Sequence, residues 1–275
     1  GIIDSYVYER IADAHLAAGQ QGEALAAYDQ ALAGERLLVS ELQLREKVAQ
    51  INRSIGNTAG AVQQYQVILD KAQNPGYRAA IEYYLGQTWF EAGETGAAYA
   101  QFERVFQNYP ESYEALNALR ALLDADMEVD QYQRVVVNYN QGQYEIAVQA
   151  LLAHRASLPS VRDDTPLTHL YIARSYRQLG NTQAALMELQ ALINRFVPED
   201  GPEWGDAWLE IADIHAGRGD VESALGVLDS FLEEHSDLPQ APEAIFKAGE
   251  IALADGRVEA ATRYFRRLAA EYPAG

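Results

Sequence analysis

Residues 19–32, "GQQGEALAAYDQAL", contain a spacing that recurs along the whole chain. Gly19 is followed five residues later by Ala24. Six more glycines are followed by alanine at the same distance, and the seven pairs are Gly19 and Ala24, Gly56 and Ala61, Gly93 and Ala98, Gly142 and Ala147, Gly180 and Ala185, Gly219 and Ala224, and Gly256 and Ala261. The glycines lie 37, 37, 49, 38, 39 and 37 residues apart, so one unit is repeated with a single insertion.

Two further positions belong to the same unit. Four residues after each alanine stands a large apolar or aromatic residue: Tyr28, Tyr65, Phe102, Leu151, Leu189, Leu228 and Phe265. Seven residues before the glycine stands a small residue in six units: Ala12, Ala49, Gly86, Ala173, Ala212 and Gly249, with Val135 as the exception. Four positions therefore keep their residue type through the repeats.

The pattern predicts two antiparallel helices in each unit. Apolar residues three and four apart precede the glycine in "YVYERIADAHLAAG" and follow it in "EALAAYDQALAG". The glycine supplies the left-handed backbone that ends the first helix. We expect the small residue and the alanine to let the two backbones approach, and the large residue to fill the gap to the neighbouring unit.

These residues resemble the tetratricopeptide repeat, whose pattern runs W-x2-L-G-x2-Y, then A-x3-F, then P. The third unit, "EYYLGQTWFEAGETGAAYAQFERVFQNYP", matches it best, with Gly86, Trp89, Ala98, Phe102 and Pro110 in order. The resemblance covers essentially the whole chain. It implies an all-α fold, a right-handed solenoid of about seven helix pairs plus one extra helix.

The 49-residue step predicts the extra helix. Residues 111–126, "ESYEALNALRALLDAD", form an unpaired helical pattern whose apolar stripe is Leu116, Leu119, Leu122 and Leu123. We therefore expect about fifteen helices: repeats one to three in residues 1–110, the extra helix in 111–127, and repeats four to seven in 128–275. Because Phe265 and Leu268 would expect a following helix, we also expect the natural protein to continue beyond residue 275, or another chain to cover this face.

Composition excludes several classes of partner. The chain of 275 residues carries a formal net charge of −19, which argues against nucleic acid, because phosphate binding needs clustered lysine and arginine. No apolar run is long enough for a membrane helix, so we expect no membrane insertion. The absence of cysteine removes disulfides and thiolate chemistry, and fits an extracytoplasmic location such as the periplasm or cell envelope.

No motif predicts catalysis, a metal or a cofactor. The five histidines, His15, His154, His169, His215 and His235, have no metal-ligand spacing such as H-E-x-x-H. His15 and His215 occupy the same repeat position, four residues before the glycine, where a packing role is expected. Phosphate loops and nucleophile elbows are absent. The chain is therefore expected not to be an enzyme, although a hydrolase that uses two groove carboxylates stays an alternative.

The resemblance implies that the first helix of each unit lines a binding groove. Projecting the repeat register gives the groove candidates Gln50, Arg53, Tyr83, Gln87, Tyr132, Asn140, Arg174, Arg177, Asp213 and Glu250, with Glu9 and Asp13 at the N-terminal end. Arg174 and Arg177 lie one turn apart and could together hold a carboxylate or a phosphate-like group. The alternative is that both form salt bridges with nearby Glu or Asp.

Residues 105–159 carry a narrower resemblance. The helix junction "NYPES", the extra helix and the unit "YNQGQYEIA" are similar to the superhelical region that precedes the catalytic domain of bacterial soluble lytic transglycosylases. That resemblance implies a non-catalytic arm of a cell-wall enzyme, which binds peptidoglycan or a protein partner. No G-L-M-Q-like stretch follows Glu111 and Ser112, so the catalytic half is absent here. The alternative is a freestanding adaptor in envelope assembly or cell division that mediates protein–protein interactions.

Overall fold

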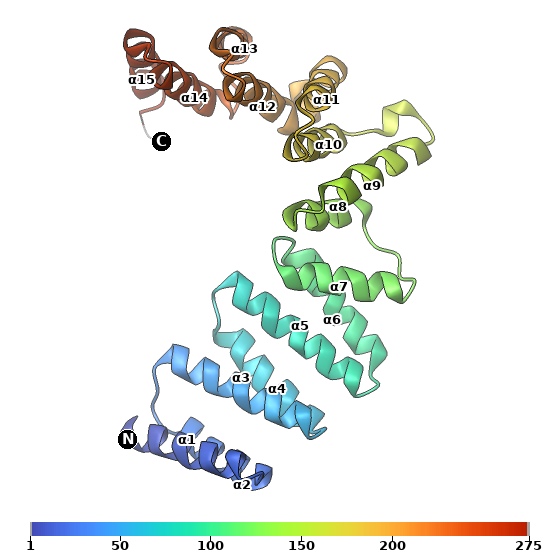
Figure 1. The fold of residues 1–275 in the computed structure, drawn as a ribbon, viewed down its shortest axis with the longest axis vertical. Coiled ribbons are helices and arrows are strands. Elements are labelled where there is room, and N and C mark those ends of the chain that lie inside the picture. The colour runs from blue at the N-terminus through green and yellow to red at the C-terminus, as the bar shows by residue number, and fades with distance from the viewer. Residues whose placement is uncertain (1, 274–275) are drawn as a thin grey trace. The chain divides into compact units, whose positions relative to one another are not determined.

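The computed structural model describes residues 2–273, and within this range the chain is all-α, with no strand. Figure 1 shows the helices in chain order. The first eight are α1 (Ile2–Ala17), α2 (Gln21–Ala33), α3 (Leu38–Ser54), α4 (Thr58–Lys71), α5 (Pro75–Glu91), α6 (Thr95–Asn108), α7 (Tyr113–Asp124) and α8 (Gln131–Asn140). The other seven are α9 (Tyr144–Ser157), α10 (Pro166–Gln178), α11 (Thr182–Arg195), α12 (Glu203–Gly217), α13 (Val221–Glu234), α14 (Ala241–Ala254) and α15 (Val258–Glu271). Two short 3-10 helices, η1 (Val161–Asp163) and η2 (Pro198–Asp200), lie in the connections before α10 and α12.

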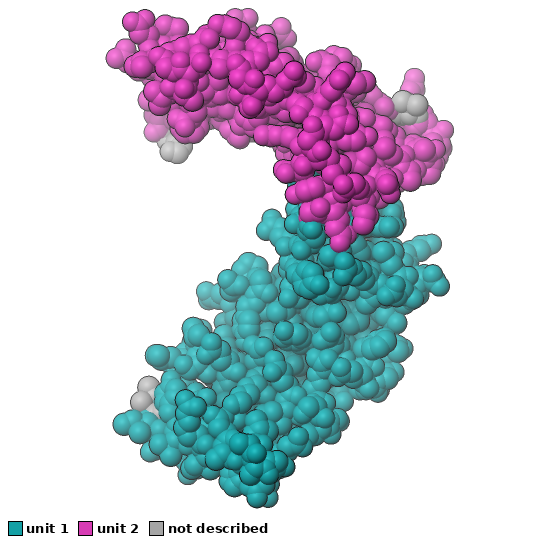
Figure 2. All heavy atoms as spheres, in the orientation of Figure 1, with its two compact units in different colours: residues 1–141 teal, residues 142–275 magenta. Residues whose placement is uncertain are grey.

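The helices form two compact units, Gly1–Gln141 and Gly142–Gly275, coloured separately in Figure 2. In the first unit α1 pairs with α2, α3 with α4, and α5 with α6, and each pair packs on the next. In the second unit α10 pairs with α11, α12 with α13, and α14 with α15, while α9 packs on α10. The predicted segment boundaries after residues 110 and 127 both fall inside the first unit.

All seven repeat glycines adopt the left-handed conformation predicted for them, with φ between 71° and 82°. After each one the chain turns back at once, as when the N–H of Gln20 donates to the carbonyl of His15 (2.9 Å). A side chain at such a position would be strained, which explains why the unit keeps glycine there. The turn therefore fixes where every first helix ends and where every second helix begins.

The extra helix α7 ends with the same kind of turn, although no glycine is present. Asp126 takes φ 54°, and the N–H of Met127 donates to the carbonyl of Leu122 (3.0 Å). Aspartate tolerates this conformation better than most residues with a side chain. The helix packs on α6 and α5 and buries Leu116, Leu119 and Leu122, whereas Leu123 is partly exposed. Thus α7 packs like the first helix of a pair, but no second helix follows it. The next helix, α8, precedes the repeat glycine Gly142 and is itself a first helix.

In two units the small and the large repeat residue are in close contact with each other. A Cβ atom on Gly86 would lie 2.7 Å from the ring of Phe102, and one on Gly249 would lie 2.5 Å from the ring of Phe265. The two units with glycine at this position are the two units with phenylalanine at the large position. Each of these two rings thus packs on the first helix of its own unit, and the large residue Tyr65 also lies against the next unit, where its ring centroid is 6.3 Å from that of Tyr84, as expected for a residue at the gap between units.

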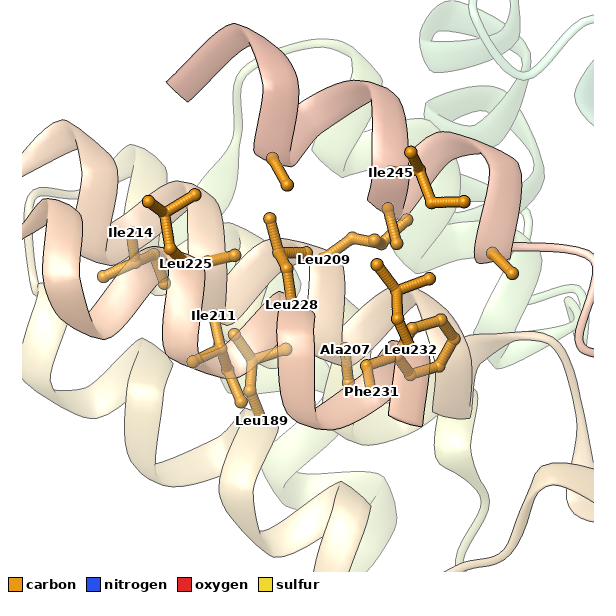
Figure 3. Packing of buried hydrophobic residues seen from close by; sticks show 14 of the residues in the cluster. Leu189, Ala207, Leu209, Ile211, Ile214, Leu225, Leu228, Phe231, Leu232 and Ile245 are labelled. Atoms are coloured by element: carbon orange, nitrogen blue, oxygen red, sulfur yellow. The ribbon is translucent and has the colours of Figure 1, made fainter. Parts of the chain in front are cut away.

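Contacts between consecutive pairs build the core of the second unit. Figure 3 shows side chains from α11, α12, α13 and α14 converging there, including Leu189, Ile211, Leu228 and Ile245. Leu228 and Ile245 are completely buried. Full burial of one such side chain stabilises the fold by about 2 kcal/mol. Each helix pair therefore depends on its neighbours for much of its stability.

The pairing of Gly86 with Phe102 predicts the effect of adding one methyl group. We expect Gly86→Ala to lower the free energy of unfolding by about 1 kcal/mol, because overpacking of 1–3 kcal/mol exceeds the roughly 1 kcal/mol gain in helix propensity. Adding Phe102→Leu should recover the loss, since alanine faces leucine in the pair Ala212 and Leu228. Urea unfolding followed by circular dichroism measures both effects.

Gly226 in α13 gives the matched control. It lies within a helix, it is exposed, and a Cβ there would meet no atom within 4 Å. Gly226→Ala should therefore raise the free energy of unfolding by about 1 kcal/mol. Equal effects of the two alanine substitutions would contradict the close fit between Gly86 and Phe102.

Candidate binding surface on the first helices

The first helices of consecutive pairs carry most of the predicted groove residues. We define the first-helix face as the exposed side chains of α1, α3 and α5 in the first unit, and of α10, α12 and α14 in the second. Side chains three, six and ten residues before the repeat glycine share one side of their helix, since these spacings are close to whole turns. Glu9, Asp13, Gln50, Asp213 and Glu250 all stand at such positions.

Three of the ion pairs between the first helices of neighbouring pairs join the same two positions of the repeat. The residue six before the glycine binds the residue nine before the next glycine, and the two carry opposite charges. Asp13 accepts from Lys47, Asp213 accepts from the Nζ of Lys247 (2.8 Å), and Arg174 donates from Nε to Glu210. We call these three pairs the charge ladder. The positive residue lies on the later helix in two pairs, as Lys47 and Lys247, and on the earlier helix in the third, as Arg174.

Asp13 shows how strongly a ladder residue is held. Burial alone would raise its pKa, but hydrogen bonds from Lys47 and from the hydroxyl of Tyr28 (2.6 Å) outweigh burial and lower the pKa. Burial would lower the pKa of Lys47, and its bonds to Asp13 and Tyr28 raise the pKa instead. Both groups therefore stay charged at neutral pH, and Asp13 has little capacity left for a ligand.

Arg53 also links α3 to α5, but from other positions of the repeat. Its Nε and Nη2 donate to the two carboxylate oxygens of Glu91 (2.6 and 2.5 Å), and its Nη1 donates to Oε1 of Gln87 (3.1 Å). This bidentate bond lowers the pKa of Glu91. Gln50 is exposed and donates to Glu46 (3.1 Å). Of the predicted residues in the first unit, Arg53 and Gln87 are thus brought together.

Arg174 and Arg177 both lie beside carboxylates of α12, but they are held differently. Arg174 donates to Glu210 and lies 3.8 Å from a carboxylate oxygen of Asp206. Arg177 lies 3.8 Å from Glu210 and 3.9 Å from Asp213, which is beyond hydrogen-bond distance, and its side chain is 42% exposed. The salt-bridge alternative therefore holds for both arginines, but Arg174 is also hydrogen-bonded to its carboxylate, whereas Arg177 lies too far from both carboxylates for a hydrogen bond.

The remaining candidates differ in their surroundings. The ring of Tyr83 is half-buried, with its centroid 5.4 Å from that of Phe102. Tyr132 is half-buried on α8, and Asn140 donates to the carbonyl of Pro110 (3.3 Å). Glu250 is exposed on α14. The ten candidates are therefore spread over several helices, and the contacts among them include Arg53 with Gln87 and Arg177 beside Asp213.

A buried polar cluster in the second unit was not found from the sequence. His169 on α10 lies with Nδ1 2.8 Å from Glu188 of α11 and with Nε2 3.1 Å from Asp164. Arg155 of α9 donates two bonds to Glu188 (3.0 and 3.2 Å), and Arg195 donates to Asp164 (3.1 Å). Because an ionised carboxylate only accepts, both ring nitrogens must donate for both contacts to be hydrogen bonds. The cluster ties α9 and the connection before α10 to the pair α10 and α11.

The other histidines have local roles. His15 lies 2.7 Å from the amide oxygen of Gln20, and His215 lies 3.3 Å from the carboxylate of Asp220, so both side chains span the glycine turn. His235 stacks edge-on against Trp204, with ring centroids 4.7 Å apart. Over residues 2–273, no group of three or more His, Asp or Glu side chains could hold a metal ion. In the same range no helix is both long and apolar enough to cross a membrane.

Glu188 predicts a pH-dependent contribution to stability. Burial would raise its pKa, but the bonds from His169 and Arg155 outweigh burial and lower the pKa below the ordinary value for glutamate. A lowered pKa in the folded state adds stability above the unfolded pKa, and this stability is lost as the pH falls through the folded value. We expect Glu188→Gln to cost about 2 kcal/mol of unfolding free energy at pH 7 and progressively less below about pH 4.

Glu145 on α9 provides the control, because it is exposed in the same unit. Glu145→Gln should leave the free energy of unfolding within about 0.5 kcal/mol of the wild type. Urea unfolding at pH 7 and at pH 3.5 makes the comparison. A constant difference between Glu188→Gln and the wild type at both pH values would contradict the coupling.

Comparisons with known proteins agree with this architecture. A family model described as tetratricopeptide repeat matches residues 10–78, 170–239 and 209–275, and a second tetratricopeptide repeat model matches residues 80–112. No curated protein matches the chain.

Three similar solved structures are two bacterial proteins and one yeast complex. A tetratricopeptide repeat protein from Parabacteroides merdae is 18% identical, with 97% of this chain and 93% of that chain covered and a TM-score of 0.40. The C-terminal part of a TPR repeat-containing protein from Cytophaga hutchinsonii is 15% identical, with coverage of 97% and 96% and a TM-score of 0.40. The complex of the TPR2AB domain of yeast Sti1 with pHSP90 is 14% identical, with coverage of 92% and 100% and a TM-score of 0.36. Since the family models match most of its length, the chain belongs to the tetratricopeptide repeat family.

Proposed function

We propose that this chain is a non-catalytic scaffold that binds a segment of a protein partner on its first-helix faces. Repeat arrays of this family are protein–protein interaction scaffolds, which present a continuous surface built from successive units. The charge ladder supports the proposal because it fixes neighbouring first helices side by side. A partner that contacts several helices then meets a surface that needs little ordering.

The proposal rests on the exposure of Arg177 and on its distances from the neighbouring carboxylates. Its side chain is 42% exposed, and its two nearest carboxylate oxygens lie at 3.8 and 3.9 Å. Glu210 and Asp213 hold the guanidinium in place without using its donors, since Glu210 accepts from Arg174 and Asp213 accepts from Lys247. A partner's carboxylate or main-chain carbonyl therefore finds a positioned donor at this point.

Net charge favours a basic partner around that anchor. The chain has 40 acidic and 21 basic residues, so a basic protein is attracted from a distance and an acidic one is repelled. The partner segment we propose is basic over its length, with one carbonyl or carboxylate placed at Arg177. This charge balance also continues to argue against nucleic acid as the ligand.

A finer proposal concerns the cell wall. The resemblance of residues 105–159 supports a role as the helical arm of a lytic transglycosylase-like enzyme, in an extracytoplasmic compartment, with peptidoglycan as ligand. This finer proposal rests on the sequence alone. The freestanding adaptor in envelope assembly or cell division uses the same first-helix faces and differs only in its ligand.

Peptide selection tests the binding function directly. Peptides are selected from a random displayed library on the immobilised chain, and their affinities are then measured by calorimetry. We expect the selected peptides to be basic, and Arg177→Glu to weaken them roughly tenfold, as for a typical arginine anchor. Arg266→Glu on α15 is the control, because Arg266 is exposed and its substitution changes the net charge equally.

Three outcomes separate the proposals. Equal weakening by the two substitutions would show a general charge effect and contradict the anchor. Unchanged affinity in Arg177→Glu would place the binding site elsewhere. Co-sedimentation with purified peptidoglycan tests the finer proposal, since saturable binding that Arg177→Glu removes supports the cell-wall arm, and absence of binding contradicts it.

A further inference from the structure

Three consecutive helices of the first unit, α4, α5 and α6, line a groove of about 620 Å³. We call it the α4–α6 groove. Its volume lies within the roughly 300–1,000 Å³ that is typical of small-molecule sites. Helix α3 packs on α4 and helix α7 packs on α6, so the groove lies inside the helix array of this unit. It is separate from the first-helix residues of the second unit that surround Arg177.

One part of the lining is apolar. Trp89 of α5 is half-buried and packs against apolar residues of both neighbouring core clusters, and Leu85 beside it is 6% exposed. Ala97 and Ala100 of α6 are exposed and short, so they leave the groove open on that side. The groove can therefore take an apolar surface of a ligand against an aromatic ring.

Glu82 of α5 gives the groove a buried carboxylate that is held in place. It is 8% exposed and accepts hydrogen bonds from Nε2 of Gln101 (3.1 Å) and from the hydroxyl of Tyr109 (2.8 Å). Arg78 lies 3.9 Å from Glu82 and donates to two main-chain carbonyls near the end of α4. Each carboxylate oxygen of Glu82 accepts one of these bonds and can accept another. A ligand hydroxyl therefore meets an acceptor that needs little ordering.

The two sides of the groove carry exposed polar side chains in matching pairs. On α4, Gln66 and Asp70 lie one turn apart, and on α6, Arg104 and Asn108 lie one turn apart. Among residues 2–273, none of these four side chains has a hydrogen-bond or ion-pair partner. Each side therefore offers a ligand one charged group and one amide, which both donates and accepts.

The charges that line the groove cancel. Arg78 and Arg104 are matched by Asp70 and Glu82, whereas the chain as a whole carries a formal net charge of −19. A strongly charged ligand of either sign would be repelled by two of these four groups. Hydroxyl groups can use donors and acceptors alike, since each of them donates and accepts. A neutral ligand with many hydroxyls fits this lining best.

We propose that the α4–α6 groove binds a neutral saccharide, with its hydroxyls on the polar sides and the C–H face of one sugar ring against Trp89. A sugar ring combines an apolar face with a dense set of hydroxyls at its edge, which is the combination that this lining matches. The proposal rests on the groove and not on the resemblance to cell-wall enzymes. It is also independent of the peptide anchor at Arg177.

Indole N–H signals in nitrogen-15 NMR spectra test the site directly. The chain has three tryptophans, Trp89, Trp204 and Trp208, and the variant Trp89→Phe identifies the signal of Trp89. The probes are neutral tetrasaccharides of glucose, of mannose and of N-acetylglucosamine. We expect at least one of them to shift the Trp89 signal in a saturable way and to leave the other two signals unchanged. No shift with any probe at about 10 mM, ten times a weak Kd of about 1 mM, overturns the proposal.

A matched pair of substitutions locates the binding site. Ala100→Met narrows the groove, and the repeat tolerates methionine there, since Met187 stands at the same distance from its glycine in α11 and is 67% exposed. We expect this variant to weaken the saccharide roughly tenfold. Ala26→Met is the control, because Ala26 is exposed at the same position in α2. Equal affinities of the two variants would place the saccharide outside the groove and contradict the proposal.

Charged probes and peptides test the class of ligand. At about 0.5 M salt, where attraction by the net charge is screened, the tetramers of glucosamine and of galacturonic acid should bind no more tightly than the neutral probes. A charged tetramer that binds roughly tenfold more tightly than every neutral one would contradict the match in charge. If the selected basic peptides shift the Trp89 signal and no saccharide does, the groove belongs to the protein partner and the proposal is wrong.

Discussion

The left-handed turn at each repeat glycine is the constraint on which the rest of this structure depends. It ends every first helix at one residue and returns the chain immediately, so the distance from the turn fixes which side chains face each other. The close contact of Gly86 with Phe102 requires this register, and so does the contact of Gly249 with Phe265. Asp126 shows that the turn, rather than glycine itself, is what ends a first helix.

A fixed register within each pair also aligns neighbouring pairs. In three steps between consecutive first helices, the residue six before one glycine meets the residue nine before the next. Asp13 with Lys47 and Asp213 with Lys247 obey this rule, and Arg174 with Glu210 obeys it with the charges exchanged. The ladder is thus a consequence of the fold, and only the choice of charge at each step is specific to this chain.

The fold was predictable from the sequence because every signal for it is local. Glycine, alanine and the large residue recur at fixed distances, and the helix pairs and the extra helix α7 followed from these distances. The groove candidates were predictable only as positions on a helix, since the partners of several of them come from the next repeat, as with Arg53 and Glu91, which are 38 residues apart. The ladder could have been found by comparing positions six and nine before successive glycines. The cluster around His169 had no such signal, because Asp164 comes from an irregular connection outside the repeat pattern.

A charged side chain that is already hydrogen-bonded and one that is not differ in how readily they can bind a ligand. Asp13 is bonded to Lys47 and Tyr28, so binding a ligand there would first have to break existing hydrogen bonds. Arg177 is oriented by two carboxylates that are already occupied by other cations, so a ligand can use its donors without breaking a hydrogen bond. This difference is the reason for proposing Arg177, rather than Asp13, as the anchor for a partner.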